Sequence, residues 1–386
     1  MKLDYNDQQR AFRAEVRAWM EANVPSGPLP SFDLTREGFE AHREWERKLN
    51  DGRWGMVTWP EELGGRGLDL IRWLIFEEEY YRANAPVRVN QNGIFLLGPT
   101  MMEFGTDEQK ARFLPRMAAG DDIWAQAWSE PGAGSDLAGV RSTATRDGEH
   151  YILNGQKIWS SRATFADWAF GLFREPGSER HRGMSLVLFR LDAPGVSVRP
   201  IERMDGEKVF AEIFLDNVRV PVADRLGEEG QGWHVCMATA GFERGLLLRS
   251  PARYQEAVRK LVALYDANKD ILPASFAERV AQSWMDADAY ALAIYAMASR
   301  LVAGGTIGPE ASTNKIFWSE LDIGLAQTAM DILGERAELM PSASMAADIG
   351  EWLQYYIFAL AGPIYAGSNE IQRNIIAERM LGLPRA

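Results

Sequence analysis

The sequence predicts an α+β multidomain protein with an N-terminal α-helical domain, a middle antiparallel β-domain and a C-terminal helical domain. Apolar residues recur at helical spacing towards both ends of the 386-residue chain, whereas short runs bounded by turn residues fill its middle. The two patterns occupy separate stretches instead of alternating, which favours segregated layers over a doubly wound fold. Within the usual error of a few residues, we place the domains at 1–121, 122–235 and 236–386.

Helical periodicity identifies the main elements of the first and third domains. It extends over residues 8–22, 43–49 and 70–83 in the first domain and over 253–265, 276–301 and 321–333 in the third. Residues 59–67 are expected to form a loop, because Pro60 and three glycines interrupt regular structure there. Thr106 is suited to cap a further helix, since Gln109 occupies the capping-box position three residues later.

Turn residues and short β-branched or apolar runs indicate the strands of the middle domain. Asp147-Gly148 and Asn154-Gly155 each lie between such runs, so we expect a hairpin turn at both places. The meander is expected to continue with strands over 168–173, 184–191, 196–201 and 210–215.

The composition argues against several classes of function. With 54 acidic and 42 basic residues, the net charge of -12 argues against a nucleic-acid-binding protein, which needs a basic surface. Cys236 is the only cysteine and the four histidines are scattered, so we expect no disulfide and no metal site. The first residues lack the layout of a signal peptide, and no uncharged apolar run reaches the roughly 18 residues of a membrane span. We therefore expect a cytoplasmic protein without a membrane partner.

The strongest local motif is the glycine-rich stretch AWSEPGAGSD at 127–136, which follows a predicted strand. Its glycines allow backbone amides to approach a ligand closely, and Ser129 and Ser135 supply hydroxyl groups. Leu137 takes the place of the third glycine in GxGxxG, and no Gly-Lys-Ser/Thr follows. The motif is therefore neither a Rossmann fingerprint nor a P-loop. Taken alone, a turn between two strands explains it equally well.

In its context, this motif resembles a signature of the acyl-CoA dehydrogenases. Four further segments are similar to that family in the same order, namely the loop at 59–67, FGTDEQK at 104–110, LNGQKIWSS at 153–161 and YAGSNEIQRNIIAER at 365–379. The resemblance covers almost the whole chain, and five motifs in order are hard to obtain by chance.

The resemblance implies a four-helix-bundle-like C-terminal domain, FAD bound between the domains and a set of binding residues. The positions that match the family's flavin-ring contacts are Gln126, Trp128, Ser129, Trp159 and Ser161. Ser135 would contact the pantetheine of CoA, while Ser368 and Glu370 would meet the diphosphate or adenosine end of FAD. A core strand tryptophan is the alternative interpretation of Trp159.

The base that the family's chemistry needs departs from the common pattern. In many members a glutamate follows the tyrosine of the C-terminal motif, but here that residue is Ala366. Isovaleryl-CoA and long-chain acyl-CoA dehydrogenases carry the base at a Glu-Arg pair, which resembles Glu243-Arg244 in a stretch that we expect at the start of a helix. We therefore expect Glu243 to remove the α-proton of the thioester, with Phe242 desolvating it and Arg244 directed elsewhere. An exposed helical ion pair is the alternative.

The resemblance also assigns roles to the backbone of the C-terminal motif. The N–H of Ala366 would polarise the thioester carbonyl, and Gly367 would allow the chain to pass close to the substrate. Two FAD-binding segments of the family differ here: DILGER stands at 331–336 in place of Gln-x-x-Gly-Gly, and 266–275 lacks Arg-x-x-Phe-Gly. Arg279 or Arg336 are candidates to supply the charge for the FAD phosphates.

The leading hypothesis is FAD-dependent α,β-dehydrogenation of an acyl-CoA in fatty acid or acyl-CoA catabolism. The family implies a homo-oligomer, a dimer or a homotetramer, that passes electrons to an electron-transferring flavoprotein. An acyl-CoA oxidase or desulfinase on the same fold is an alternative, as is a non-catalytic or partner subunit of a heteromer. The acyl group is not identified by the sequence.

Overall fold

The computed structural model describes residues 4–243, 249–340, 343–346 and 349–384. Its contacts divide the chain into two compact units, each assembled from segments that are separated in the sequence. The sheet unit comprises Pro25–Leu68 and Pro86–Glu243, and the helical unit comprises Met1–Val24, Asp69–Ala85 and Arg244–Ala386. The N-terminal helices therefore contribute to both units, and the three sequence domains with their boundaries stay a prediction.

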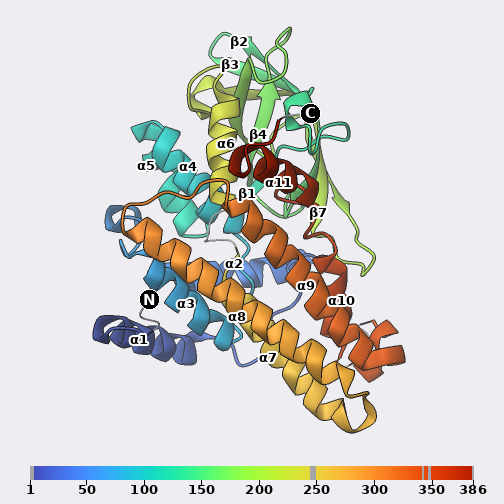
Figure 1. Cartoon of the computed structure of the whole chain (residues 1–386). Coiled ribbons are helices and arrows are strands. Elements are labelled where there is room, and N and C mark those ends of the chain that lie inside the picture. The colour runs from blue at the N-terminus through green and yellow to red at the C-terminus, as the bar shows by residue number, and fades with distance from the viewer. Residues whose placement is uncertain (1–3, 244–248, 341–342, 347–348, 385–386) are drawn as a thin grey trace. The chain divides into compact units, whose positions relative to one another are not determined.

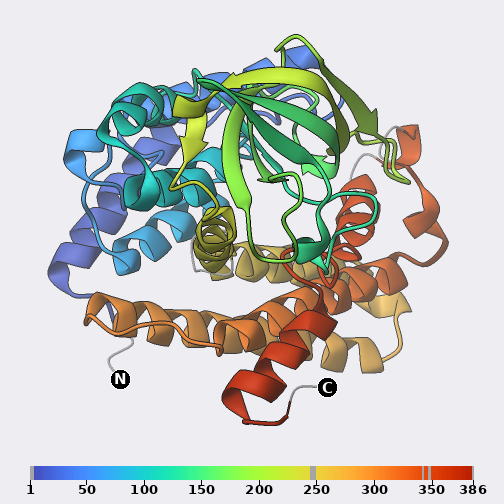
Figure 2. The ribbon, with the colours of Figure 1, turned by 90° about the horizontal axis from the view of Figure 1, so that it is seen from above.

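A twisted sheet forms the centre of the sheet unit (Figure 2). Its strands in the described part of the chain are β1 (Trp124–Ala127), β2 (Thr143–Asp147), β3 (His150–Ser161), β4 (Trp168–Arg174), β5 (Met184–Arg190), β6 (Val196–Ile201), β7 (Phe210–Pro221) and β8 (Arg225–Leu226). They are ordered β6-β7-β3-β2-β4-β5-β8, with β1 paired to β4. The pairs that carry most of the sheet are antiparallel, while β1 runs parallel to β4. The strands predicted after residue 167 are confirmed.

The hairpin turn expected at Asn154-Gly155 is wrong, because β3 continues through it. β3 pairs with β7 on both sides of this point, and a register shift between Leu153 and Gly155 marks a β-bulge. Gly155 has a φ of 139°, and a Cβ there would lie 2.2 Å from Oγ of Ser142. The glycine therefore serves a bulge and a close approach, whereas the turn at Asp147-Gly148 is confirmed between β2 and β3.

Helices also belong to the sheet unit. They include α2 (Arg36–Asp51), the π-helical segment η2 (Asn92–Leu97), α4 (Gly98–Phe104), α5 (Asp107–Ala118) and α6 (Gly232–Glu243). The predicted cap of α5 is confirmed, because the side chains of Thr106 and Gln109 each accept a hydrogen bond from the backbone N–H of the other. α6 packs against β5, η2 and α4, and the Thr100 hydroxyl donates to the Thr239 hydroxyl at 2.9 Å. These contacts fix α6 to the sheet unit.

The helical unit contains the longest helices of the described chain. Its helices are α1 (Asp7–Asn23), α3 (Leu70–Arg82), α7 (Pro251–Asn268), α8 (Ser275–Val302), α9 (Ala311–Leu333), α10 (Gly350–Ala359) and α11 (Asn369–Ile375). Figure 1 shows α7, α8 and α9 side by side, and their apolar faces bury Tyr254, Ile294 and Leu325 in one core. The helices predicted from apolar spacing are confirmed, and with them the predicted fold class.

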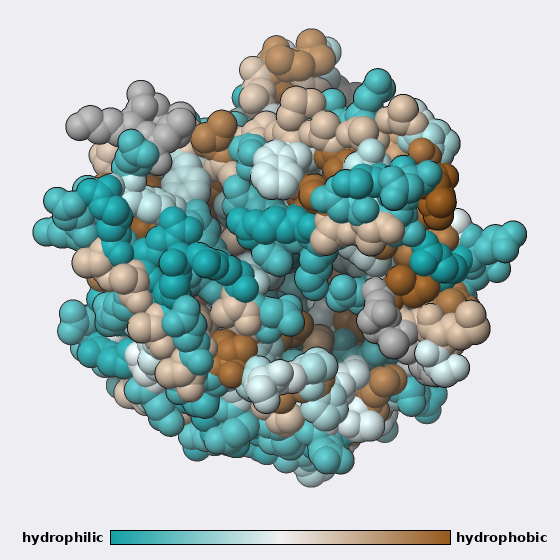
Figure 3. Space-filling view, turned by 90° about the horizontal axis from the view of Figure 1, so that it is seen from below, coloured by the Kyte–Doolittle hydropathy of each residue, from teal (hydrophilic) through white to brown (hydrophobic). Residues whose placement is uncertain are grey.

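On the face seen in Figure 3, hydrophobic residues are interspersed with hydrophilic ones. None of the helices in the described residues combines the length and apolar character that a membrane span requires.

Candidate active site

The residues matched to the flavin ring gather where β1 and β3 approach each other in the sheet unit. Gln126 lies in β1 and is half-buried, and Trp128 follows with only 7% of its surface exposed. The N–H of Ile158 donates to the carbonyl of Ser129 at 2.9 Å, which joins the segment after β1 to β3. Because Trp159 is the next residue of β3, this hydrogen bond brings Ser129 and Trp159 close together.

Trp159 presents its ring to solvent from the end of β3. The residue is 56% exposed, and its φ of 60° lies in the left-handed region that non-glycine residues seldom adopt. Its ring packs edge-on against Phe210, with centroids 5.9 Å apart, and Phe210 pairs across the strands with the half-buried Ser161. Trp124 and Trp168, in contrast, stack inside the unit. The exposure of Trp159 argues against the core-tryptophan alternative and suits a ring-stacking role.

Ser135 is exposed on the glycine-rich segment, between two fixed points. On one side, Glu130 and Ala133 exchange backbone hydrogen bonds of 2.9 and 3.0 Å. On the other side, the Arg174 guanidinium donates to the carbonyls of Ala138 at 2.7 Å and Val140 at 3.0 Å. The hydroxyl of Ser135 is therefore presented from a loop whose two ends are held.

The structure corrects the expected setting of Glu243. This residue is not at the start of a helix, because α6 begins eleven residues earlier, at Gly232. Gly241 lies inside α6 without interrupting it. Phe242 is half-buried, whereas Arg244 and the side chain of Glu243 lie outside the described residues. The catalytic assignment of Glu243 therefore stays a prediction.

Ala366 and Gly367 form a tight turn in the helical unit. Their φ values of 57° and 78° are both left-handed, and the Gln372 side-chain amide donates to both carbonyls, at 3.3 and 3.1 Å. The buried ammonium of Lys315 donates to the carbonyl of Gly362 and to the side-chain oxygen of Asn369, on either side of this turn. The turn thus exposes its backbone in one defined conformation.

Ser368 and Glu370 begin α11, directly after this turn. The Ser368 side chain accepts from the N–H of Ile371 at 3.3 Å and caps the helix. Glu370 is exposed, and a hydrogen bond from its own backbone N–H, followed by one from Ser368, lowers the pKa of its carboxyl group. Both side chains therefore have a local capping role, and their contact with FAD stays a prediction.

The structure brings two groups of predicted residues together, one in each unit. In the sheet unit, the residues matched to the flavin ring lie at or just after the last residues of β1 and β3, namely Gln126, Trp128, Ser129, Trp159 and Ser161. In the helical unit, the second group lies at the start of α11 and directly before it, namely Ala366, Gly367, Ser368 and Glu370. Sequence reasoning missed Glu130, Lys157, Lys315 and Gln372, which hold these groups in place.

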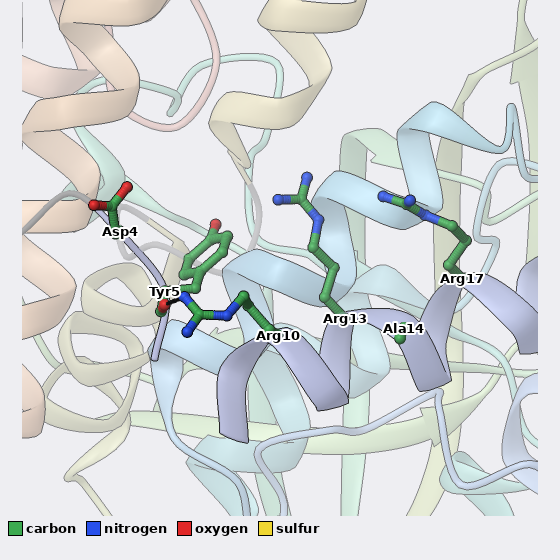
Figure 4. Close-up of a pocket in the computed structure, with 6 residues that line it drawn as sticks. All are labelled: Asp4, Tyr5, Arg10, Arg13, Ala14 and Arg17. Carbon is green, nitrogen blue, oxygen red and sulfur yellow. Dashed lines mark hydrogen bonds between the residues drawn. The ribbon is translucent and has the colours of Figure 1, made fainter. Parts of the chain in front are cut away.

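A separate hollow of about 440 Å³ lies on the helical unit and contains no predicted site residue. Figure 4 shows Arg10, Arg13 and Arg17 along α1 beside it. Arg13 and Arg17 contact the carboxylate of Glu79, which is 2% exposed, at 2.7 and 2.8 Å. Arg13 and Arg17 therefore join α1 to α3 through ion pairs. In the described part of the chain, no group of three His, Cys, Asp or Glu residues could hold a metal ion.

Family comparisons cover the chain from end to end. The acyl-CoA dehydrogenase N-terminal domain matches residues 6–121, the middle domain 125–218 and the C-terminal domain 230–381. The chain belongs to the acyl-CoA dehydrogenase family. It is thus a member of an enzyme family that binds FAD, as the resemblance of its motifs implied.

Named relatives of this chain include acyl-CoA dehydrogenases of Mycobacterium tuberculosis. It is 41% identical to acyl-CoA dehydrogenase IpdE1 of Mycobacterium tuberculosis over 97% of both chains, and 34% identical to acyl-CoA dehydrogenase FadE26 of the same organism over the full length of both. Among solved structures, it is similar to the Tcur3481-Tcur3483 steroid ACAD, with 29% identity, a TM-score of 0.89 and full coverage of both chains. The ChsE4-ChsE5 complex from Mycobacterium tuberculosis gives 33% identity and a TM-score of 0.84, again over both full chains.

The residues of the sheet unit have the chemistry that a flavin ring needs. Trp159 supplies an exposed aromatic face, and Ser129 and Ser161 supply half-buried hydroxyl groups near it. The indole N–H of Trp128 is buried without a hydrogen-bond partner, but so are those of Trp124 and Trp168 in the core, so it does not by itself mark a ligand site. The exposed ring and the two hydroxyls fit a bound heteroaromatic cofactor with polar edges.

Proposed function

We propose that this acyl-CoA dehydrogenase catalyses the FAD-dependent α,β-dehydrogenation of an acyl-CoA thioester, with Glu243 as the base. The observation that carries the proposal comes from the sequence. In a chain that matches the family throughout, position 366 has an alanine where many members have the catalytic glutamate, and position 243 has a glutamate. Ala366 cannot accept a proton, so the reaction needs a base elsewhere. Glu243 is the residue that occupies the base position of the isovaleryl-type relatives.

The residues of the chain divide the chemistry between them. Glu243 removes the α-proton, and the N–H of Ala366 donates to the thioester oxygen, where negative charge develops. Gln126, Trp128, Ser129, Trp159 and Ser161 orient the flavin, and Ser135 and Gly367 border the pantetheine. When bound, FAD supplies the acceptor for the hydride that leaves the β-carbon. Phe242, half-buried at the end of α6, helps to exclude water from the carboxylate.

The test is the Glu243→Gln variant, which keeps the shape of the side chain but cannot take a proton. We expect turnover to fall by at least ~100-fold, the lower range for loss of a general base, with FAD content unchanged. Glu228→Gln is the matched control, because Glu228 is exposed and belongs to the same unit. Wild-type turnover by Glu243→Gln would reject the assignment.

A second variant makes this test sharper. If positions 243 and 366 serve the same α-carbon, adding Ala366→Glu to Glu243→Gln should restore part of the lost turnover. Ala366 already has a left-handed backbone, so the larger side chain adds little backbone strain beyond that present. No recovery, together with retained FAD and retained stability, would argue that only one of the two positions faces the substrate.

The relatives suggest the substrate class and the assembly. Because a steroid ACAD and the ChsE4-ChsE5 complex are similar over the whole chain, we propose a bulky, ring-bearing acyl group and an oligomer, either a homotetramer or a heteromer. The altered 331–336 segment favours a partner chain that completes FAD binding. Electrons would pass to an electron-transferring flavoprotein in the cytoplasm. Purification with and without a co-expressed relative, followed by native mass and FAD content, distinguishes the two assemblies. Comparing a ring-bearing with a straight-chain thioester tests the substrate.

A further inference from the structure

Lys157 is a fully buried cation in β3 of the sheet unit, with 0% of its side chain exposed. Its ammonium group lies 2.8 Å from Oε1 of Glu130 and donates to the carbonyls of Leu172 at 2.5 Å and Trp128 at 3.4 Å. An ammonium group has three hydrogens, and each has an acceptor here. Lys157 therefore connects β3, β4 and the start of the glycine-rich segment at one point.

Glu130 completes the connection from the other side. Its carboxylate accepts from the N–H of Arg141 at 2.6 Å and from the N–H of Ser142 at 2.9 Å, in addition to Lys157. Burial acts to raise the pKa of Glu130, but the Lys157 charge and these hydrogen bonds outweigh it and hold the pKa below its usual value. The carboxylate thus remains charged beside the ammonium.

These contacts hold both ends of one segment. Trp128 marks its beginning and Ser142 its end, and between them lie Ser129 and Ser135, which the proposed function places at the flavin and at the pantetheine. Buried ion pairs of this kind are often replaceable by apolar residues without loss of stability. Stability alone therefore does not explain the pair. Its directional hydrogen bonds to four backbone groups instead indicate that the pair holds the segment in one conformation.

We propose that Glu130 and Lys157 are a positioning pair, which fixes the segment 128–142 in the conformation that meets both the cofactor and the substrate. The inference rests on the proposed function. It assigns no contact with reacting atoms to either residue; both act through Ser129, Ser135 and the Trp128 backbone. Removing the pair should loosen the segment and weaken both ligands, even where the fold remains intact.

The experiment compares two double variants of the full chain. Glu130→Gln/Lys157→Met removes both charges of the pair at nearly constant volume. Glu46→Gln/Arg88→Met is the matched control, since Glu46 and Arg88 form an equally buried pair of 2.7 Å in the same unit, outside the segment. Melting temperature, amide hydrogen exchange over 128–142, and the affinities for FAD and for free CoA are measured for each. Glu130→Asp, which keeps the charge and shortens the side chain by one methylene group, serves as a milder second variant if the double variant does not fold.

We expect exchange over 128–142 to accelerate ~10-fold or more in Glu130→Gln/Lys157→Met, the effect of losing about one charge-assisted hydrogen bond. Its affinities for FAD and CoA should fall by a similar factor, while the control double variant keeps wild-type exchange and affinities. Wild-type exchange over the segment would overturn the proposal, and so would faster exchange with unchanged affinities. Failure of the wild-type chain itself to bind FAD or CoA would instead reject the proposed function.

Discussion

The sheet unit and the helical unit each use a buried lysine to hold a segment of the candidate site, but the two lysines have different partners. Lys157 is bound to the carboxylate of Glu130 as well as to backbone carbonyls. Lys315, only 2% exposed, donates to the carbonyl of Gly362 at 2.9 Å and to the side-chain oxygen of Asn369 at 2.7 Å. The first segment presents side chains from a long loop, and the second presents backbone from a short turn.

The different partners of the two lysines match the different amounts of restraint that a long loop and a short turn need. A segment as long as 128–142 has many conformations, so ordering it costs more conformational entropy than ordering the turn at 366–367. A carboxylate that accepts from two backbone N–H groups and an ammonium restrains several residues at once. The turn is restrained mainly by its left-handed residues and by Gln372. The hydrogen bonds of Lys315 to two neutral acceptors therefore add to a turn that is already restrained.

The largest effect on the comparison is expected from Lys157→Met. The substitution leaves Glu130 as a buried charge without its cation, which typically costs about 3–5 kcal/mol of unfolding free energy. Urea unfolding in matched buffer measures the loss, and Lys110→Met, on the surface of the same unit, is the control. A loss below about 1 kcal/mol would mean that Glu130 is not charged in the fold, and the contrast between the two lysines would disappear.

Lys315→Met should cost less, because the two groups that accept its hydrogen bonds are neutral and the Glu370 carboxylate, on which its charge also acts, is exposed. Gly362 and Asn369 would each lose one donor, at about 1 kcal/mol for each unmade hydrogen bond, so we expect a total of about 2 kcal/mol. Lys260→Met, at an exposed ion pair of the same unit, should change the unfolding free energy by less than about 0.5 kcal/mol. A loss for Lys315→Met equal to that for Lys157→Met would contradict the proposed difference between the partners.

The sequence predicted the elements of both units better than it predicted the contacts that hold the site. Apolar spacing identified α1, α7 and α8, and capping residues identified α5, because these signals are local. The Asn154-Gly155 dipeptide was misassigned because a β-bulge and a tight turn both favour glycine, and only the pairing of β3 with β7 distinguishes them.

The supporting residues of the site depend on contacts that are remote in sequence. Glu130 and Lys157 lie in two quoted motifs, yet their pairing follows from how β1 and β3 approach each other, which spacing within one motif does not encode. Trp159 was identified by family position, and its exposure and left-handed backbone, which support the assignment, are properties of the fold alone. Glu243 was expected at the start of a helix, whereas α6 begins at Gly232 and continues through Gly241, which helix propensity alone does not favour.

Gly367→Ala should destabilise the turn by about as much as Lys315→Met. An added Cβ would lie 2.5 Å from Nε2 of Gln372, at a residue whose φ is 78°. We expect a loss of about 2 kcal/mol, of which about 1 kcal/mol is backbone strain. Gly304→Ala isolates the strain, because Gly304 has a φ of 82° and nothing within 4 Å of an added Cβ. Equal losses in the two variants would show that the Gln372 contact does not restrain the turn.

The smallest effect, and the one that separates the two lysines by chemistry, is the response to pH. The pKa of Glu130 in the fold is below its ordinary value of 4.5, so its contribution to stability is fully present above that pH and is lost as the pH falls through the folded-state pKa. The difference in unfolding free energy between the wild-type chain and Glu130→Gln should therefore shrink below about pH 4.5. For Lys315→Met the difference should change far less over that range, because the carbonyl of Gly362 and the amide of Asn369 do not titrate and the Glu370 carboxylate, on which Lys315 acts, is exposed. Urea unfolding of the wild-type chain and both variants at several pH values measures these differences. If the two differences depend on pH in the same way, the charge on Glu130 is not what distinguishes the sheet segment from the helical turn.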